Sequence, residues 1–110
     1  MAPARELVTQ IYKEAQKFTS LLNMKIVAVY GGSSVGEQIN SLKKGCDIVV
    51  CTPGIHPSLS FKPLGRMIDL LCLNSGRLIS FTRISFVVLD EADRMLDDGF
   101  EPQVCLLSLL

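Results

Sequence analysis

Residues 87–93, Val-Val-Leu-Asp-Glu-Ala-Asp, form an apolar run that ends on a cluster of carboxylates. A central strand of an α/β sheet is covered on both faces, so its sequence is continuously apolar rather than alternating. Ligands bind beyond the carboxyl ends of such strands, in a crevice of the open sheet. The stretch therefore predicts a buried strand over Ile84–Leu89 that leads into an acidic site.

The acidic residues suit a magnesium ion and a water molecule. Asp90 follows the strand directly and could reach magnesium itself or through the waters that this metal retains. Glu91 lies beside it and could orient or deprotonate an attacking water. A plainer alternative is that Asp90 caps the next helix, while Glu91 and Asp93 complement the positive end of its dipole.

The composition is that of one globular domain of an intracellular protein. The chain has 110 residues, of which 48% are hydrophobic, and 11 basic residues balance 11 acidic ones. Any contact with a polyanion must therefore be local, and nothing indicates specificity for DNA. The 4 cysteines include no Cys-x-x-Cys pair, which favours reduced thiols over zinc or disulfides. The sequence contains no apolar run of about 18 residues, so it predicts no membrane segment.

The pattern of apolar residues predicts helices alternating with strands. Leu7, Val8 and Ile11 begin a helical repeat, and Ser34 with Glu37 forms a capping-box signature. The predicted helices are Arg5–Leu22, a segment from Ser34 to Lys43-Lys44-Gly45, and Arg66–Leu73; the predicted strands are Lys25–Tyr30, Asp47–Cys51 and Ile84–Leu89. Long crossovers of this kind indicate an α/β fold, a parallel sheet with helices on both faces. Three strands make a thin sheet, so we expect part of a domain.

Several short motifs resemble the first RecA-like domain of DEAD-box ATP-dependent RNA helicases. In chain order they are Pro3-Ala4-Arg5-Glu6-Leu7, Gly31-Gly32, Thr52-Pro53-Gly54, Asp90-Glu91-Ala92-Asp93 and Gly99-Phe100. The flanking Tyr30, Glu37-Gln38 and Asn74-Ser75-Gly76-Arg77 are most similar to the subgroup that acts on pre-mRNA in early spliceosome assembly. That resemblance implies RNA and spliceosomal proteins as partners, and a nuclear location, with the cytoplasm as the alternative.

The resemblance implies a surface that grips RNA without reading its bases. Its residues are Pro3, Arg5, Glu6, Gly31, Gly32, Thr52, Pro53, Gly54 and Arg66. Arg5 would meet phosphate through its fork-shaped guanidinium, and Gly32 would let an RNA backbone approach closely. Taken singly, each segment also has an ordinary interpretation, as a solvated first turn, a simple turn or a strand end.

The resemblance also implies ATP and magnesium as cofactors. In the family Asp90 serves the magnesium on the nucleotide phosphates, Glu91 serves the hydrolytic water, and Asp93 helps to couple hydrolysis to RNA binding. These are the implied catalytic residues, and Asp90 is the implied metal ligand.

The 110 residues depart from the family in what they contain. They hold no Gly-x-x-x-x-Gly-Lys-Ser/Thr, no Ser-Ala-Thr segment and no second RecA-like domain. A phosphate-binding loop contributes several charge-assisted hydrogen bonds, so its loss removes on the order of 6 kcal/mol of nucleotide affinity. We therefore expect a fragment of a helicase without ATPase activity alone. The alternatives are a non-catalytic truncated isoform that binds RNA or spliceosomal partners, an unstable product, and another ATPase class with a similar acidic strand end.

Further departures concern the domain limits. The resemblance assigns residues 1–104 to the partial helicase ATP-binding domain, with an atypical insert at about 55–65 that displaces Arg66 from Thr52. The insert contains His56, which we interpret as a loop residue rather than a metal ligand. Residues 105–110 are an apolar, atypical tail, expected to be exposed. Ala4 replaces a usual threonine, which removes a helix cap worth about 0.5–2 kcal/mol.

Overall fold

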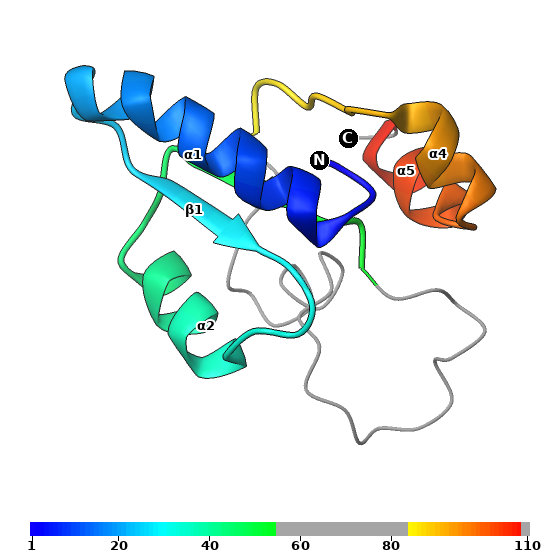
Figure 1. The fold of residues 1–110 in the computed structure, drawn as a ribbon, viewed down its shortest axis with the longest axis horizontal. Helices are drawn as coiled ribbons and strands as arrows, with labels where there is room; N and C mark the ends of the chain where they lie inside the picture. Colours follow the sequence, from blue (N-terminus) through cyan, green and yellow to red (C-terminus); the bar gives the residue numbers. More distant parts are fainter. Residues whose placement is uncertain (55–83, 109–110) are drawn as a thin grey trace.

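The computed structural model describes residues 1–54 and 84–108 and has helices beside a small parallel sheet (Figure 1). The elements are α1 (Arg5–Leu21), β1 (Ile26–Val29), α2 (Val35–Lys43), β2 (Ile48–Cys51), α4 (Ala92–Asp97) and α5 (Glu101–Ser108). The first four lie where the sequence predicts them. The predicted helix Arg66–Leu73 and the predicted insert at 55–65 lie outside the described residues.

The strands β1 and β2 pair in parallel, and α2 provides the crossover between them. Their register runs from Ile26 opposite Ile48 to Val29 opposite Cys51. A parallel pair cannot be joined by a hairpin, which explains why a helix separates two such short strands. The α/β class and the parallel pairing are thus confirmed.

The two faces of the sheet are covered by different helices. Val29 and Cys51 pack with Leu42 of α2 in one buried cluster. Val50 packs with Val8 of α1 in the other. Successive strand residues point to opposite faces, so the continuously apolar strands are what a sheet with helices on both sides requires. This prediction is also confirmed.

Neither long helix has a side-chain cap at its N-terminus. Ala4 occupies the N-cap of α1 and makes no such hydrogen bond, as expected for a residue without a hydroxyl. Ser34 occupies the N-cap of α2, yet its side chain makes no cap hydrogen bond either. The predicted capping box is therefore present in position but wrong in its hydrogen bonding. Gln38, buried at 8% exposure, anchors this turn instead through Ser33.

The predicted strand Ile84–Leu89 is wrong, because this segment has no strand structure and is not buried. Phe86 is 90% exposed and Val88 is 73% exposed. The segment lacks a strand because its only hydrogen-bonded neighbour among the described residues is short, namely the N-terminal residues Met1 and Ala2. The amino group of Met1 donates to the carbonyl oxygen of Val88, and the N–H of Asp90 donates to the carbonyl oxygen of Met1 at 2.9 Å.

On its other side this N-terminal segment contacts β2. The N–H of Ala2 donates to the carbonyl oxygen of Cys51 at 3.0 Å. Met1 and Ala2 thus stand between β2 and the apolar segment, but they reach only its end. Within residues 1–54 and 84–108, no hydrogen-bonded strand lies beside residues 84–87. An apolar sequence alone does not make a strand when the paired neighbour is missing.

The chain closes with α4 and α5, two short helices that pack on each other. Met95 of α4 is completely buried and anchors the pair. The N–H of Phe100 donates to the carbonyl oxygen of Met95 at 2.9 Å, which closes the turn between them. The tail was not expected to be helical, yet α5 extends to Ser108. No helix in the described parts of the chain is long and apolar enough to cross a membrane.

Candidate functional site

Three segments that are distant in sequence meet at the carboxyl ends of β1 and β2. They are residues 3–5 before and at the start of α1, residues 30–32 after β1, and residues 52–54 after β2. Figure 1 shows the start of α1 and the ends of the strands on the same side of the molecule. The N–H of Thr52 donates to the carbonyl oxygen of Val29 at 3.1 Å, which holds the two strand ends together. This is the edge at which open parallel sheets bind ligands.

Arg5 is held in place by an aromatic ring. Its Cζ atom lies 5.6 Å from the centroid of the Tyr30 ring, within the range of a cation–π interaction. The side chain is exposed and has no ion-pair partner in residues 1–54 and 84–108. Arg5 is also the first residue of α1, where backbone N–H groups favour anions. Among the described residues the guanidinium is therefore positioned and has no compensating charge, which suits a phosphate contact.

Gly32 lies directly against this arginine. Its φ of 83° is in the left-handed region, and a Cβ atom added there would meet Nη1 of Arg5 at 3.3 Å. A side chain would therefore be strained by its own backbone and would also crowd the guanidinium. The structure brings together two of the predicted RNA-contact residues, and the glycine leaves the arginine accessible.

Sequence reasoning did not assign roles to Tyr30 and Gln38, although both organise this turn. Oε1 of Gln38 accepts from the N–H of Tyr30 at 3.1 Å, and Nε2 donates to the carbonyl oxygen of Tyr30 at 3.1 Å. Nε2 also donates to the hydroxyl of Ser33. The signals available were an aromatic residue directly before the glycine pair and a glutamine on the inner face of the next helix.

The segment after β2 is partly buried. Pro53 is almost completely enclosed, whereas Thr52 is half-buried. Gly54 has a φ of 117°, a conformation that residues with a side chain rarely adopt. Thr52 thus stays partly accessible at the strand ends, and a residue in a left-handed conformation follows at Gly54.

The other predicted RNA-contact residues differ in accessibility. Glu6 is exposed on the first turn of α1, Gly31 is half-buried, and Pro3 is buried. Pro3 therefore shapes the start of α1 rather than offering a contact surface. Arg66 lies outside the described residues.

The acidic cluster is exposed and contains an unusual backbone conformation. The N–H of Asp90 donates to the carbonyl oxygen of Met1, and Asp90 itself is exposed. Glu91 has φ 52° and ψ 49°, a left-handed conformation, and it is the N-cap of α4. Oε2 of Glu91 lies 3.2 Å from Nη1 of Arg94. The alternative in which Asp90 caps the helix is wrong, because Glu91 holds that position and makes no side-chain cap.

These carboxylates alone do not form a metal site. In residues 1–54 and 84–108, no group of three or more His, Cys, Asp or Glu side chains could hold a metal ion. Asp90 and Glu91 still offer accessible carboxylate oxygens, the ligand type that magnesium takes while keeping several waters. The described residues therefore fit one or two contacts to a hydrated magnesium, but not a complete nucleotide site.

Two thiols have a raised pKa, one before β2 and one at its end. Cys46 and Cys51 are both free cysteines. Burial raises the pKa of Cys51 to about 11, although the nearby N-terminal ammonium partly opposes this. Burial and, to a lesser extent, the charge of Asp47 also raise the pKa of Cys46. Neither thiol has the lowered pKa of a reactive nucleophile.

Comparison with known proteins places these observations in a family context. The pattern of the DEAD/DEAH box helicase family matches residues 1–109. The chain is 52% identical over 104 residues to DEAD-box ATP-dependent RNA helicase 42 of rice. This match covers 94% of the chain and 9% of the rice protein. It is 53% identical over 104 residues to the human probable ATP-dependent RNA helicase DDX46, again covering 94% of this chain and 9% of the relative.

Solved structures give the same result. The yeast DEAD-box splicing factor Prp28 superimposes with a TM-score of 0.75 at 37% identity, over 96% of this chain and 21% of Prp28. A hypothetical ATP-dependent RNA helicase from Sulfolobus tokodaii superimposes with a TM-score of 0.77 at 30% identity, over 96% of this chain and 27% of that one. The chain thus spans about a tenth of its curated relatives and matches the RecA-like domain of the solved structures.

Proposed function

This chain belongs to the DEAD/DEAH box helicase family, and we propose from this premise that residues 1–104 are an RNA-gripping part of the ATP-binding domain of an RNA helicase. The observation that carries the proposal is the position of Arg5, stacked over Tyr30 and bordered by Gly32. A fixed, uncompensated guanidinium beside a side-chain-free backbone suits a phosphate. It gives no means of distinguishing bases.

We propose a set of RNA contacts that is supported by this arrangement. Arg5 supplies the positive charge, and Gly31 and Gly32 permit close approach of the RNA backbone. Thr52 and Gly54 supply contacts after the end of β2. Pro3 and Pro53 position these segments, while Glu6 limits the approach from the side of α1. Arg66 belongs to the proposal through the family resemblance.

For the nucleotide we propose that Asp90 contacts magnesium, that Glu91 orients the attacking water and that Asp93 links the two activities. The family uses ATP with magnesium. The 110 residues contain no Gly-x-x-x-x-Gly-Lys-Ser/Thr, so a polypeptide of only these residues should bind ATP weakly. We therefore infer that these residues alone bind RNA but do not turn over ATP.

The names of the relatives support a proposal for the substrate and the location. Prp28 is described as a splicing factor, and this chain is 37% identical to it. We infer that the chain acts on pre-mRNA with spliceosomal proteins, in the nucleus. Imaging of a fluorescently tagged chain in the cells that express it would test the location.

RNA binding is tested by fluorescence anisotropy with a fluorescein-labelled 12-nucleotide oligouridylate. Arg5→Glu should weaken binding by about tenfold, because an attraction to phosphate becomes a repulsion. Lys13→Glu makes the same charge change on an exposed part of α1 and is the matched control. Equal loss in both variants would contradict the proposed site, since it would indicate a contribution of net charge alone.

A second candidate is a non-catalytic binding module, and the sequence observation that favours it is the missing phosphate-binding motif. It is distinguished by measuring phosphate release from ATP with and without the same oligonucleotide. RNA-stimulated turnover that is lost in Glu91→Gln would exclude the binding module. RNA affinity without turnover is expected under both candidates for a polypeptide of only these residues, and the size of the cellular protein on an immunoblot then separates a helicase from a truncated isoform.

A further inference from the structure

In the part of the chain that the structure describes, β1 has an outer edge that no other strand covers. The carbonyl oxygens of Lys25 and Val29 point to β2, and they accept at 3.1 Å from the N–H of Ile48 and at 3.1 Å from the N–H of Thr52, the residue after β2. Backbone groups of alternate residues point to opposite sides of a parallel strand. Those of Ile26 and Ala28 therefore point outward, and they have no hydrogen-bond partner in the described parts of the chain.

One position of this edge is already satisfied, and it shows what the edge accepts. The side-chain amide of Gln38 donates to and accepts from the backbone of Tyr30, both at 3.1 Å. The side chain of Gln38 thus pairs with the N–H and the carbonyl oxygen of Tyr30, as a peptide group of a neighbouring strand would. The open edge begins beyond this point and runs back toward Lys25.

A hollow of about 420 Å³ lies along the open edge. The backbone segment Ile26–Ala28 lines it, with Tyr12 of α1 on one side and Ser41 of α2 on the other. These two helices cover opposite faces of the sheet, so the hollow opens at the edge between them. This is the place that an added strand would occupy.

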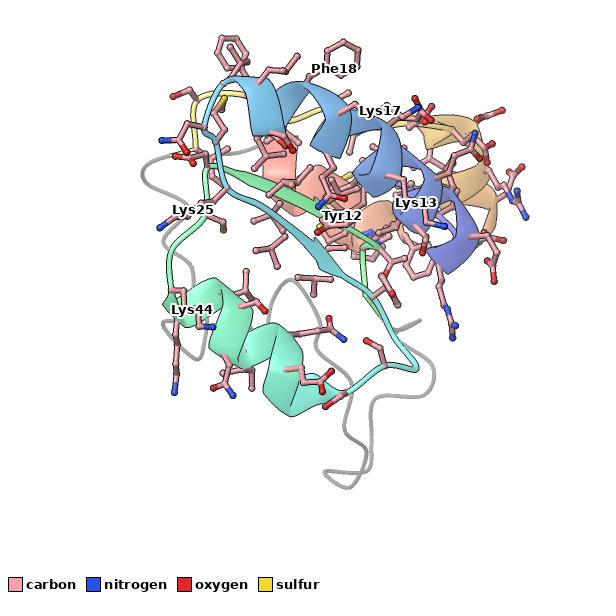
Figure 2. All side chains as sticks on the ribbon, turned by 60° about the vertical axis from the view of Figure 1, so that its left-hand side comes forward. Tyr12, Lys13, Lys17, Phe18, Lys25 and Lys44 are labelled. Carbon is pink, nitrogen blue, oxygen red and sulfur yellow. The ribbon has the colours of Figure 1, made fainter. Side chains whose placement is uncertain are left out.

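The hollow has opposite charges at its two ends. Lys25 and Lys44 line the end where β1 begins, and Figure 2 shows them on the same side of the molecule. Both are exposed and have no ion-pair partner in residues 1–54 and 84–108. The carboxylate of Asp47 accepts from the backbone N–H of Lys25 at 2.7 Å, so two lysines and one carboxylate leave this end with a net positive charge. Glu37 lines the hollow beside Gln38, near the end of β1. An extended ligand with an acidic end at the lysines therefore matches the site.

We propose that the outer edge of β1 is a docking site for an extended peptide segment of a partner protein, added as an antiparallel strand with its acidic C-terminal end at Lys25 and Lys44. The N-terminal end of the segment faces Glu37, which fixes the direction. When a peptide binds by adding a strand to a sheet, main-chain hydrogen bonds provide the affinity. RNA fits less well, because it does not offer donors and acceptors alternating at the spacing of a strand. The site is separate from the RNA surface proposed above.

The test uses the 110-residue chain and the synthetic peptide Lys-Thr-Val-Thr-Val-Thr-Asp-Glu with free ends. Binding is followed by ¹⁵N amide shifts and hydrogen exchange. We expect the N–H of Ala28 to exchange at least about tenfold more slowly in the complex, since strand addition gives it an acceptor. Two N-methylated peptides, each modified at the alternate set of residues, refine the test. One should lose binding and the other keep it.

The charges are tested with Lys25→Glu/Lys44→Glu, which should weaken peptide binding by about tenfold. Lys13→Glu/Lys17→Glu makes the same change on α1 outside the hollow and is the matched control. The proposal is overturned if Ala28 gains no protection, if both N-methylated peptides bind like the unmodified one, or if both double variants are equally affected. It is also overturned if a 12-nucleotide oligouridylate displaces the peptide through Lys25 and Lys44.

Discussion

Gln38 and Tyr30 are joined by two hydrogen bonds of 3.1 Å, in which one side-chain amide satisfies both backbone polar groups of one residue. Gln38 belongs to α2 and is buried, whereas Tyr30 directly follows β1 and stacks with Arg5. The pair therefore links the helix that covers one face of the sheet to the arginine at the candidate RNA surface.

The first prediction concerns this pair. Gln38→Ala should lower the free energy of unfolding by about 1–3 kcal/mol, because the two backbone groups of Tyr30 lose their partner in a partly buried place. Urea unfolding followed by circular dichroism measures the change. Gln16→Ala, an exposed glutamine of α1 without a side-chain hydrogen bond in the described residues, is the control and should cost less than about 0.5 kcal/mol. Similar losses in both variants would show that the pair does not stabilise the fold.

The second prediction separates backbone strain from crowding of Arg5. Gly32 and Gly45 have φ values of 83° and 80°, but an added Cβ meets Arg5 only at Gly32 and meets nothing within 4 Å at Gly45. Alanine at either position should cost about 1 kcal/mol of stability. Only Gly32→Ala should weaken oligouridylate binding, by about three- to tenfold, and it should reduce the dependence of affinity on salt.

The measurement is fluorescence anisotropy at several salt concentrations. If Gly45→Ala weakened RNA binding as much as Gly32→Ala, the effect would be due to lost stability, and the contact between Gly32 and Arg5 would have no role in binding.

The third prediction is a loss of stability at alkaline pH. Burial raises the pKa of Cys51 from 9.0 to about 11, so the folded state retains the thiol proton after the unfolded state has released it. The stabilising effect of the buried neutral thiol is complete below pH 9 and is lost as the pH rises from about 9 to 11. The full difference corresponds to roughly 3 kcal/mol.

Urea unfolding between pH 7.5 and 10.5 measures this slope. Cys51→Ala should be less stable at every pH because of the lost packing, yet its stability should decline less steeply above pH 9. Parallel curves for the two proteins would contradict the assignment. All other groups are common to both proteins, so their contributions cancel in the comparison.

Local sequence patterns predicted the helices that bury one apolar face against the sheet. The spacing of Leu7, Val8 and Ile11 predicted α1, and glycine after Lys44 predicted the end of α2. The third strand failed because burial of Phe86 and Val88 requires a paired neighbour, which no property of residues 84–89 reveals. Helix α5 was missed because its leucine-rich sequence lacks an amphipathic pattern, although Pro102 is acceptable in a first turn.

The candidate site was predictable as a set of residues but not as a geometry. Arg5 and Gly32 were named from the motifs, yet their contact depends on the crossover that brings the ends of the strands to the start of α1. The roles of Tyr30 and Gln38 arise from long-range contacts between a side chain and the backbone or a ring. The conformation of Glu91 could not be predicted, because glutamate rarely adopts a positive φ.

The fourth prediction tests the conformation of Glu91. A non-glycine residue at φ 52° costs about 1–2 kcal/mol relative to a relaxed backbone, and such strain persists where the surrounding structure imposes it, often at functional sites. Glu91→Gly should therefore raise the free energy of unfolding by about 0.5–1 kcal/mol. The loss of the ion pair with Arg94 subtracts little, because both side chains are substantially exposed.

Asp93→Gly in the first turn of α4 is the matched control, since it also places glycine in the acidic cluster but at a helical position. It should lower the free energy of unfolding by about 0.5–1 kcal/mol, because glycine has a lower helix propensity than aspartate and a carboxylate near the positive end of the helix is lost. Thermal and urea unfolding of the two variants should thus differ in sign. A loss of stability in Glu91→Gly would mean that Glu91 is relaxed there, and the acidic cluster would then hold no stored strain for a ligand to exploit.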